Sequence, residues 1–225
     1  MEKLVVILLM GGSSSRFGGP KNKLLCQLKG KRVFEYSLDT FANLKEFDNI
    51  YIAVNPEIRE EVEAYIKEKG INATLFDGGE TREQSVWNVL VKTYPNEYIV
   101  VVHDAARPLI DKDIIFRLLD GLKSEPNICG ATTSIPVTDT LAMVDQGYAT
   151  RFPDRSRFVQ VQTPQAFFGG LLWEAHYLKD KDAIATDDCS LMLEQGRDII
   201  VVEGSKKLHK VTTIEDIKYL EGLLK

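Results

Sequence analysis

The sequence predicts one α/β domain, built on a mostly parallel β-sheet that is flanked by helices. Short runs rich in Val and Ile alternate with longer amphipathic segments along most of the 225 residues. These runs lack polar alternation, which is typical of strands that are buried on both faces. An alternation of strand and helix favours parallel strands joined by right-handed crossovers.

The expected elements follow this alternation along the chain. We expect strands at residues 3–10, 49–54, 73–76, 98–102, 129–135 and 198–203. Helices are expected at residues 34–44, 58–69, 82–94, 112–124, 171–179 and 214–224. Thr212 and Glu215 have the spacing of a capping box at the start of the last helix. Because no repeat, linker or low-complexity tract interrupts the pattern, residues 1–225 are expected to form a single domain.

The alternation of strands and helices is interrupted at residues 138–161, "TDTLAMVDQGYATRFPDRSRFVQV", which have no helical pattern. Their apolar positions alternate in short stretches on both sides of a "DQGY" turn, which indicates a hairpin; a solvated loop is the alternative. A hairpin of this length has little to pack on within one domain. We therefore expect a projecting β-arm that packs on a partner and forms a dimer.

Composition excludes some partners. The net charge of -5 offers no broad basic field for nucleic acid or for an anionic membrane. The first apolar run is too short to span a membrane and is expected to be a buried strand. Cys26, Cys129 and Cys189 have neither metal-ligand spacing nor the pattern of a disulfide framework, which fits a cytoplasmic protein.

The stretch "LLMGGSSSRFGGPKNKLL", residues 8–25, follows the first strand. The loops after the strands of such sheets form the ligand crevice. Gly11 and Gly12 allow close backbone approach, and N–H groups in such a loop can surround phosphate oxygens. Arg16, Lys21 and Lys23 could add positive charge. Neither a G-x-G-x-x-G motif nor a Walker motif is present, so phosphate binding and a flexible turn with solvated cations both remain open.

Two further loops follow expected strands. In "DGGETREQSVWNVL", Thr81 and Gln84 have capping-box spacing, and the Ser85 hydroxyl could face the same crevice. An ordinary strand-to-helix loop explains this segment equally well. In "YIVVVHDAARPLI", Asp104 stands where a carboxylate could hold a divalent metal on phosphate oxygens. Asp104 could instead cap a turn or pair with Arg107, and His103 is expected to be a packed structural histidine.

The last two clusters are "VQTPQAF" with "ATDDCSL", and "GSKKLHKVTT". Thr163 and Pro164 are interpreted as a break before a helix. Thr186 is expected to be the N-cap of a helix that opens with Asp187 and Asp188, whose charges suit its positive end; acid/base chemistry by these two adjacent carboxylates is the alternative. The lysines of the last cluster follow a strand, so one of them could reach the crevice. Together the loops favour chemistry by positioning and charge neutralisation, such as attack on a nucleoside triphosphate.

In order and spacing, the strings "GGSSSRF", "NKLL", "DGGETREQSV", "VVHDAARPLI", "PVTDTL", "VQTPQAF", "TDDCSL" and "GSKKLHKVTTIEDI" resemble the 2-C-methyl-D-erythritol 4-phosphate cytidylyltransferases. The resemblance covers essentially the whole chain. It implies a Rossmann-like nucleotidyltransferase fold, a homodimer with exchanged arms, and a Mg²⁺-dependent reaction. In that reaction CTP and a sugar-alcohol phosphate of the non-mevalonate isoprenoid pathway give a CDP-sugar alcohol and pyrophosphate.

The resemblance also implies roles for individual residues. The catalytic group would comprise Arg16, Lys23, Lys210 and Asp104, with Asp104 near the ribose and the metal. Nucleotide binding is implied for Gly11, Gly12, Ser13, Ser14, Asp77, Gly78, Arg82, Ser85 and Ala105. Binding of the sugar phosphate is implied for Arg107, Thr140, Arg155 and Thr163, with Thr140 and Arg155 supplied by the partner's arm.

The sequence departs from the family pattern in three places. The first loop opens Met10-Gly11-Gly12 instead of Ala-Ala-Gly, and Leu208 replaces the usual Asn. The third departure is Asn22-Lys23-Leu24, which stands in place of Pro-Lys-Gln. The phosphate lysine is assigned to Lys23 by its distance from Arg16, and Lys21 is the competing candidate. Ribitol-5-phosphate cytidylyltransferase is a close alternative, although Ala106 and the TDD string favour the isoprenoid enzyme. A nucleotide-binding relative without catalytic activity is the third alternative.

Overall fold

The computed structural model describes residues 3–12, 17, 22–179 and 187–224. Seven strands form the central sheet: β1 (Lys3–Met10), β4 (Asn49–Val54), β5 (Ala73–Asp77), β6 (Tyr98–Asp104), β7 (Ile128–Pro136), β10 (Val159–Phe168) and β11 (Asp198–Glu203). The helices are α1 (Val33–Ala42), α2 (Arg59–Lys69), α3 (Arg82–Thr93), α4 (Lys112–Leu122), α5 (Gly169–Tyr177), α6 (Asp188–Glu194) and α7 (Ile214–Leu223). The predicted helices agree with these bounds to within two residues, which is the usual uncertainty of a helix end.

The strand order in the sheet is β11-β7-β10-β6-β1-β4-β5. All neighbours are parallel except β10, which runs antiparallel to both β6 and β7. Strand β1 occupies the middle of the parallel part, between β6 and β4. The predicted mostly parallel sheet is therefore confirmed, with one antiparallel strand inserted into it.

Two hydrophobic cores cover the two faces of the sheet. Along β1, Val6 and Leu8 pack in one core, while Val5 and Ile7 pack in the other, and all four side chains are fully buried. The first core includes side chains from α1, α2, α4 and α7, and the second includes side chains from α3, α5 and α6. Burial on both faces explains why the strands are continuous apolar runs without polar alternation.

The sequence-based interpretation of "VQTPQAF" is wrong, because Thr163 and Pro164 lie inside β10 and do not end the chain segment before a helix. The ladder between β10 and β7 shifts register between Val161 and Gln165, and the polar residues of the string lie at this irregularity. Two N-caps also differ by one residue from the prediction. Asp187 caps α6 through its side chain, and Thr213 with Asp216 forms the capping box of α7.

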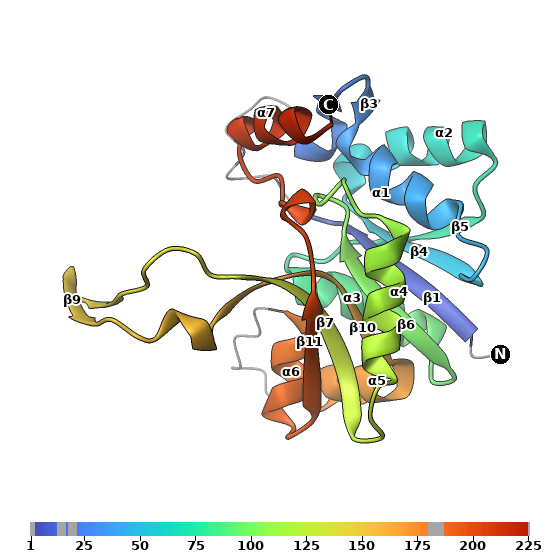
Figure 1. Cartoon of the computed structure of the whole chain (residues 1–225). Coiled ribbons are helices and arrows are strands. Elements are labelled where there is room, and N and C mark those ends of the chain that lie inside the picture. Colours follow the sequence, from blue (N-terminus) through green and yellow to red (C-terminus); the bar gives the residue numbers. More distant parts are fainter. Residues whose placement is uncertain (1–2, 13–16, 18–21, 180–186, 225) are drawn as a thin grey trace.

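Residues 138–161 contain the predicted hairpin, formed by β8 (Met143–Asp145) and β9 (Tyr148–Arg151). Figure 1 shows this segment extending away from the body, with β9 near its tip. The regular hairpin is shorter than the expected arm, because its remaining residues are irregular or form the short turn η3 (Arg155–Arg157). Val159–Val161 already belong to β10 at the base of the arm. Two further strands that were not predicted, β2 (Gln27–Leu28) and β3 (Lys31–Arg32), form a small ribbon.

Candidate active site

The carboxyl ends of β1 and β5 approach each other so closely that only glycine fits between them. A Cβ atom on Gly78 would lie 2.8 Å from the Cα atom of Gly11. Ser85, in the first turn of α3, accepts a hydrogen bond from the Gly79 N–H at 2.9 Å and donates one to the Thr81 carbonyl at 2.9 Å. The Ser85 hydroxyl therefore holds the glycine turn against the start of α3.

Three cationic side chains surround the Asp104 carboxylate at the end of β6. The Nζ atom of Lys210 lies 2.7 Å from Oδ2, and the Nε atom of Arg82 lies 3.3 Å from Oδ1. The Nε atom of Arg107 lies 3.8 Å from Oδ2. Asp104 is only 6% exposed, so solvent screens these attractions little. The three cations come from α3, from the loop after β6 and from the segment before α7.

Burial by itself disfavours the ionised form of Asp104. The nearby charges of Arg82, Lys210 and Arg107 outweigh that penalty and hold the pKa of Asp104 well below its ordinary value. Burial likewise acts to lower the pKa of the Arg82 guanidinium, but Asp188 and Asp104 raise it above its ordinary value. Asp104 and Arg82 are therefore both ionised at neutral pH.

Backbone contacts fix the segment that carries Lys210. The Val211 N–H donates to the Ala106 carbonyl at 2.8 Å, and the Arg107 guanidinium donates to the Leu208 carbonyl at 2.6 Å. The side chain of Leu208, where the resemblance led us to expect Asn, is fully buried. The carbonyl of Leu208 thus ties the Lys210 segment to the loop after β6 without a polar side chain.

Two cavities meet at this cluster. The first, of about 110 Å³, is lined by Leu9, Gly11, Gly12, Lys23, Gly79, Glu80, Thr81, Arg82, Ser85, Asp104, Ala106 and Lys210. The second, of about 230 Å³, is lined by Arg82, Asp104, Arg107, Val161, Gln162, Thr163, Gln165, Asp187 and Lys210. Arg82, Asp104 and Lys210 line both. Two ligands that occupied these cavities would therefore meet at the same three charged side chains.

Thr163 connects the antiparallel strand β10 to Asp104. Its hydroxyl oxygen accepts a hydrogen bond from the Asp104 N–H at 3.0 Å and lies 3.3 Å from His103 Nδ1. The other ring nitrogen of His103, Nε2, lies 3.1 Å from the Arg107 carbonyl oxygen. A carbonyl can only accept, so Nε2 carries the ring proton and Nδ1 accepts from the Thr163 hydroxyl. His103 is therefore the packed structural histidine that was expected.

Several predicted residues lie away from both cavities. The side chain of Asp77 is exposed and pairs with the Arg59 guanidinium at 2.6 Å, and Asp77 does not line the first cavity. Ala105 is fully buried, and its N–H donates to the Leu9 carbonyl at 3.1 Å. Arg155, on the arm, donates to the Thr138 carbonyl at 2.5 Å. Neither Arg155 nor Thr140 lines either of these cavities in its own chain.

Other predicted residues lie outside the described part of the chain. These are Ser13, Ser14, Arg16, the competing Lys21, and Thr186. Lys23 does lie in the described part, at the start of the short helix η1 (Lys23–Leu25), and it lines the first cavity.

Sequence reasoning missed a buried acid behind the site. Asp188 was expected only to stabilise the start of a helix. Its Oδ2 atom instead lies 2.6 Å from the Arg82 guanidinium, and its Oδ1 atom lies 2.9 Å from His176 Nε2. Its neighbour Asp187 accepts a hydrogen bond from the Gln165 amide at 2.6 Å. The two partners of Asp188 are 106 and 12 positions away in the sequence, so no local spacing could have revealed them.

The side chains near the cavities decide whether the site could hold a metal ion. Within the described ranges, no group of three or more His, Cys, Asp or Glu side chains could hold a metal ion. Mg²⁺ sites in nucleotide enzymes need only one or two carboxylates, because substrate phosphates supply the other ligands. Asp104 lines both cavities and is a single carboxylate of that kind, with its two oxygens already in contact with Lys210 and Arg82.

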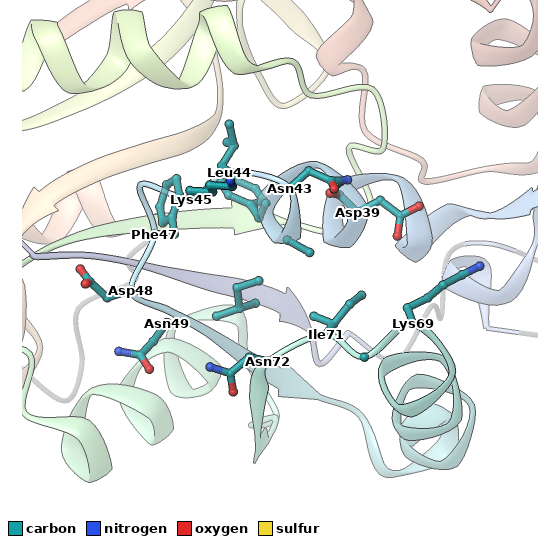
Figure 2. A pocket seen from close by; sticks show the side chains of 14 residues that line it. Asp39, Asn43, Leu44, Lys45, Phe47, Asp48, Asn49, Lys69, Ile71 and Asn72 are labelled. Atoms are coloured by element: carbon teal, nitrogen blue, oxygen red, sulfur yellow. Dashed lines mark hydrogen bonds between the residues drawn. The ribbon is translucent and has the colours of Figure 1, made fainter.

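A third cavity, of about 570 Å³, lies elsewhere in the fold, around the carboxyl end of α1 and the start of β4. Figure 2 shows its polar side chains, which include Asp39, Asp48, Lys45 and Lys69. Its acids already have partners, because Asp39 accepts from Lys31 and Tyr65, and Asp48 accepts from the Leu4 N–H. It lies at the amino end of β4, whereas Asp104 lies at the carboxyl end of β6. Among the described residues, no helix has the length and apolar character needed to cross a membrane.

Burial lowers the pKa of His103 to about 4, from an ordinary value of 6.5. Between pH 7 and pH 5 the unfolded chain binds a proton at this position and the folded chain does not. The free energy of unfolding should therefore fall by about 2 kcal/mol through His103 alone. Urea unfolding of the wild type and of His103→Gln at both pH values measures this contribution. We expect the decrease to be smaller in the variant by that amount, and an equal decrease in both proteins would contradict the assignment.

Comparison with known proteins gives the family. The family model described as 2-C-methyl-D-erythritol 4-phosphate cytidylyltransferase matches residues 4–225. A curated relative of that name from Dictyoglomus thermophilum is 34% identical over 229 residues, which cover 100% of this chain and 97% of the relative. Another of that name, from Bacillus anthracis, is 36% identical over 225 residues, which cover 97% of this chain and 96% of the relative.

Solved structures agree with the sequence comparison. The 2-C-methyl-D-erythritol 4-phosphate cytidylyltransferase of Thermus thermophilus superposes with a TM-score of 0.77 at 31% identity, covering 100% of this chain and 99% of that one. The 4-diphosphocytidyl-2C-methyl-D-erythritol synthase of Anaerococcus prevotii superposes with a TM-score of 0.85 at 25% identity, covering 99% and 96%. This chain therefore belongs to the 2-C-methyl-D-erythritol 4-phosphate cytidylyltransferase family.

Proposed function

We propose that this chain carries out the reaction for which its family is named. CMP passes from CTP to 2-C-methyl-D-erythritol 4-phosphate, giving 4-diphosphocytidyl-2-C-methyl-D-erythritol and pyrophosphate in the non-mevalonate isoprenoid pathway. The observation that carries the proposal is the charged cluster of Arg82, Asp104 and Lys210, which two adjoining cavities share. A transfer between two phosphate-bearing substrates needs such a shared boundary.

The first cavity suits CTP. Glycines at Gly11, Gly12 and Gly79 allow the nucleotide to approach the backbone, and Lys23 and Lys210 supply positive charge. In the reaction a phosphate oxygen of the sugar phosphate attacks the α-phosphorus of CTP. A new P–O bond forms, the bond from the α-phosphorus to the bridging oxygen breaks, and pyrophosphate leaves with that electron pair. Cations placed in advance around the α-phosphate stabilise the charge that develops there.

Arg16 belongs to this group by its position in the family motif, and it lies outside the described residues. Asp104 would hold Mg²⁺ together with the triphosphate. When bound, the ion would neutralise phosphate charge and assist the departure of pyrophosphate. We also propose a cytoplasmic setting, on the ground of the number and spacing of the cysteines given above.

The second cavity suits the phosphate of the sugar alcohol. Arg107 and Thr163 line it, and a guanidinium fork matches a phosphate dianion. The family resemblance assigns Arg155 and Thr140 to this site as well, and both lie on the arm. Since the arm projects from its own body (Figure 1), we propose that these two residues act in the partner subunit of a homodimer.

Exposed apolar side chains on the arm support the dimer. They include Met143, Val144, Tyr148, Phe152, Phe158 and Val161, and Tyr148 is 79% exposed. An apolar group of this kind on a projecting segment is typical of a surface that another protein covers. An exchange of arms would bury these side chains and bring Arg155 to a second active site.

The reaction is tested by measuring pyrophosphate release from CTP with each possible acceptor. We expect release with 2-C-methyl-D-erythritol 4-phosphate, and a loss of turnover of about a hundredfold in Lys210→Ala, because one preorganised donor is removed. Faster release with ribitol 5-phosphate would instead support the ribitol enzyme. No release with either acceptor would support a relative without catalytic activity.

The exchange of arms is tested by mixing subunits. Lys23→Ala and Arg155→Ala homodimers each have two damaged sites. If Arg155 acts in the partner's site, a mixed dimer has one site with both lesions and one complete site. A fully exchanged equal mixture should recover about a quarter of the wild-type activity, because half of the dimers are mixed and each has one complete site.

The matched control mixes Lys23→Ala with the double variant Lys23→Ala, Arg155→Ala. Every site then lacks Lys23, so no activity should return. If subunit exchange is confirmed by mass spectrometry and the first mixture also stays inactive, Arg155 does not act in the partner's site.

A further inference from the structure

Behind the active site lies a buried row of charged and polar groups, of which His176 and Asp188 have no role in the reaction described above. His176 on α5 contacts Asp188 on α6, Asp188 contacts Arg82 on α3, and Arg82 contacts Asp104 on β6. Asp188 is 0% exposed, and the side chain of His176 is 1% exposed. The row therefore runs from the second hydrophobic core to the boundary between the two cavities.

The capping of α6 does not explain Asp188. The N-cap is Asp187, whose carboxylate accepts a hydrogen bond from the Ser190 N–H at 2.9 Å. Asp188 turns inward instead and bonds to the side chains of two other helices. A buried ion pair is weak evidence for stability, because well-packed apolar residues often serve a core as well or better. The cost of burying this pair points to a role in orienting Arg82.

The geometry defines what Asp188 does to Arg82. The Nε atom of Arg82 bonds to Asp104 at 3.3 Å, and Nη1 bonds to Asp188 at 2.6 Å. Two carboxylates on different elements therefore hold the planar guanidinium from two sides, which leaves it little freedom to rotate. The remaining nitrogen, Nη2, is buried and has no hydrogen-bond partner among the described residues. Arg82 lines both cavities, so the N–H groups of its guanidinium that have no partner, those of Nη2 above all, are the donors left for a ligand oxygen that reaches the guanidinium.

His176 in turn holds Asp188. The imidazole is stacked on the indole of Trp87, with ring centroids 6.2 Å apart and an angle of 6° between the planes. Trp87 also contacts Trp173, at 5.8 Å between ring centroids. The two tryptophans of the chain thus both lie in the group that supports His176. This packing fixes the donor Nε2 at the Asp188 carboxylate.

We propose that Asp188, oriented by His176, is a positioning residue that fixes the guanidinium of Arg82 so that Nη2 donates to the phosphate at which the two substrates meet. This inference rests on the proposed cytidylyl transfer. The observation that carries it is the unpartnered Nη2 at a boundary that both cavities share. Asp188 acts only through Arg82 and touches neither substrate.

A double-mutant cycle tests this dependence. The variants are Asp188→Asn, Arg82→Lys and the two combined. Lys keeps the positive charge between the two acids but lacks the planar guanidinium with its several N–H donors. We expect Asp188→Asn to lower kcat by about ten- to a hundredfold through misplacement of the guanidinium, with the KM for CTP changed less than about threefold. On the Arg82→Lys background, Asp188→Asn should change kcat by less than about threefold, since there is no fork left to position.

The proposal would be overturned if the fold-decrease in kcat of the double variant equalled the product of the fold-decreases of the two single variants. Leu191→Val, also on α6 and buried, is the control for altered packing and should leave kcat unchanged. Tryptophan emission and thermal unfolding check that each variant keeps the fold around Trp87 and Trp173. Turnover by the wild type is measured first. An inactive wild type would contradict the proposed function, whereas an active wild type with multiplying losses would contradict only this inference.

If Asp188→Asn does not fold, His176 provides a second test. Gln can keep a donor near the position of Nε2, whereas Phe keeps the ring shape and removes the donor. We expect His176→Gln to retain much more of the wild-type kcat than His176→Phe. Equal kcat values for the two variants would overturn the proposal.

Discussion

Three cationic side chains converge on the Asp104 carboxylate, and the arrangement of the site depends on that contact. Arg82, Arg107 and Lys210 would repel one another if they were placed together without an anion. One buried carboxylate removes that repulsion and fixes the direction from which each cation approaches. The result is a cationic surface already in place at the boundary of the two cavities, where we propose that the two anionic substrates meet. This preorganisation reduces the reorganisation that the reaction would otherwise need.

The fold supplies this contact from distant parts of the chain. Strand β6 ends at Asp104 in the middle of the sheet, and the antiparallel strand β10 brings the Thr163 hydroxyl to its backbone N–H. The loop before α7 is tied to the loop after β6 by the hydrogen bond between Val211 and Ala106, which places Lys210. In a mainly parallel sheet, the loops that follow the parallel strands all lie at the carboxyl ends of those strands. The segment between β7 and the antiparallel strand β10 begins at these same ends. The projecting arm starts from this region, which is where a second subunit would complete the sugar-phosphate site.

Much of this organisation is predictable from the sequence. The parallel strands are continuous apolar runs because both faces are covered, and their ends identify Gly11, Asp104 and the loop that carries Lys210. Strand β10 could not be predicted, because the polar residues and the proline at Thr163, Pro164 and Gln165 interrupt its apolar pattern. The strand end at Asp77 was located correctly, but the direction of its side chain was not, since its contact with Arg59 is tertiary. The contacts of Asp188 were also hidden, because local sequence cannot distinguish a helix-capping acid from one that turns into the core.

The measurement that tests the role of Asp104 most directly is the kcat of Asp104→Asn at saturating concentrations of both substrates, together with the calorimetric Kd for CTP. Asn has nearly the same shape but lacks the charge that holds three cations in place. We expect kcat to fall by at least about a hundredfold, while the Kd for CTP changes by less than about tenfold, because the cations remain nearby but are no longer aligned. A folded Asp104→Asn protein whose kcat stays within a few-fold of the wild type would contradict this account.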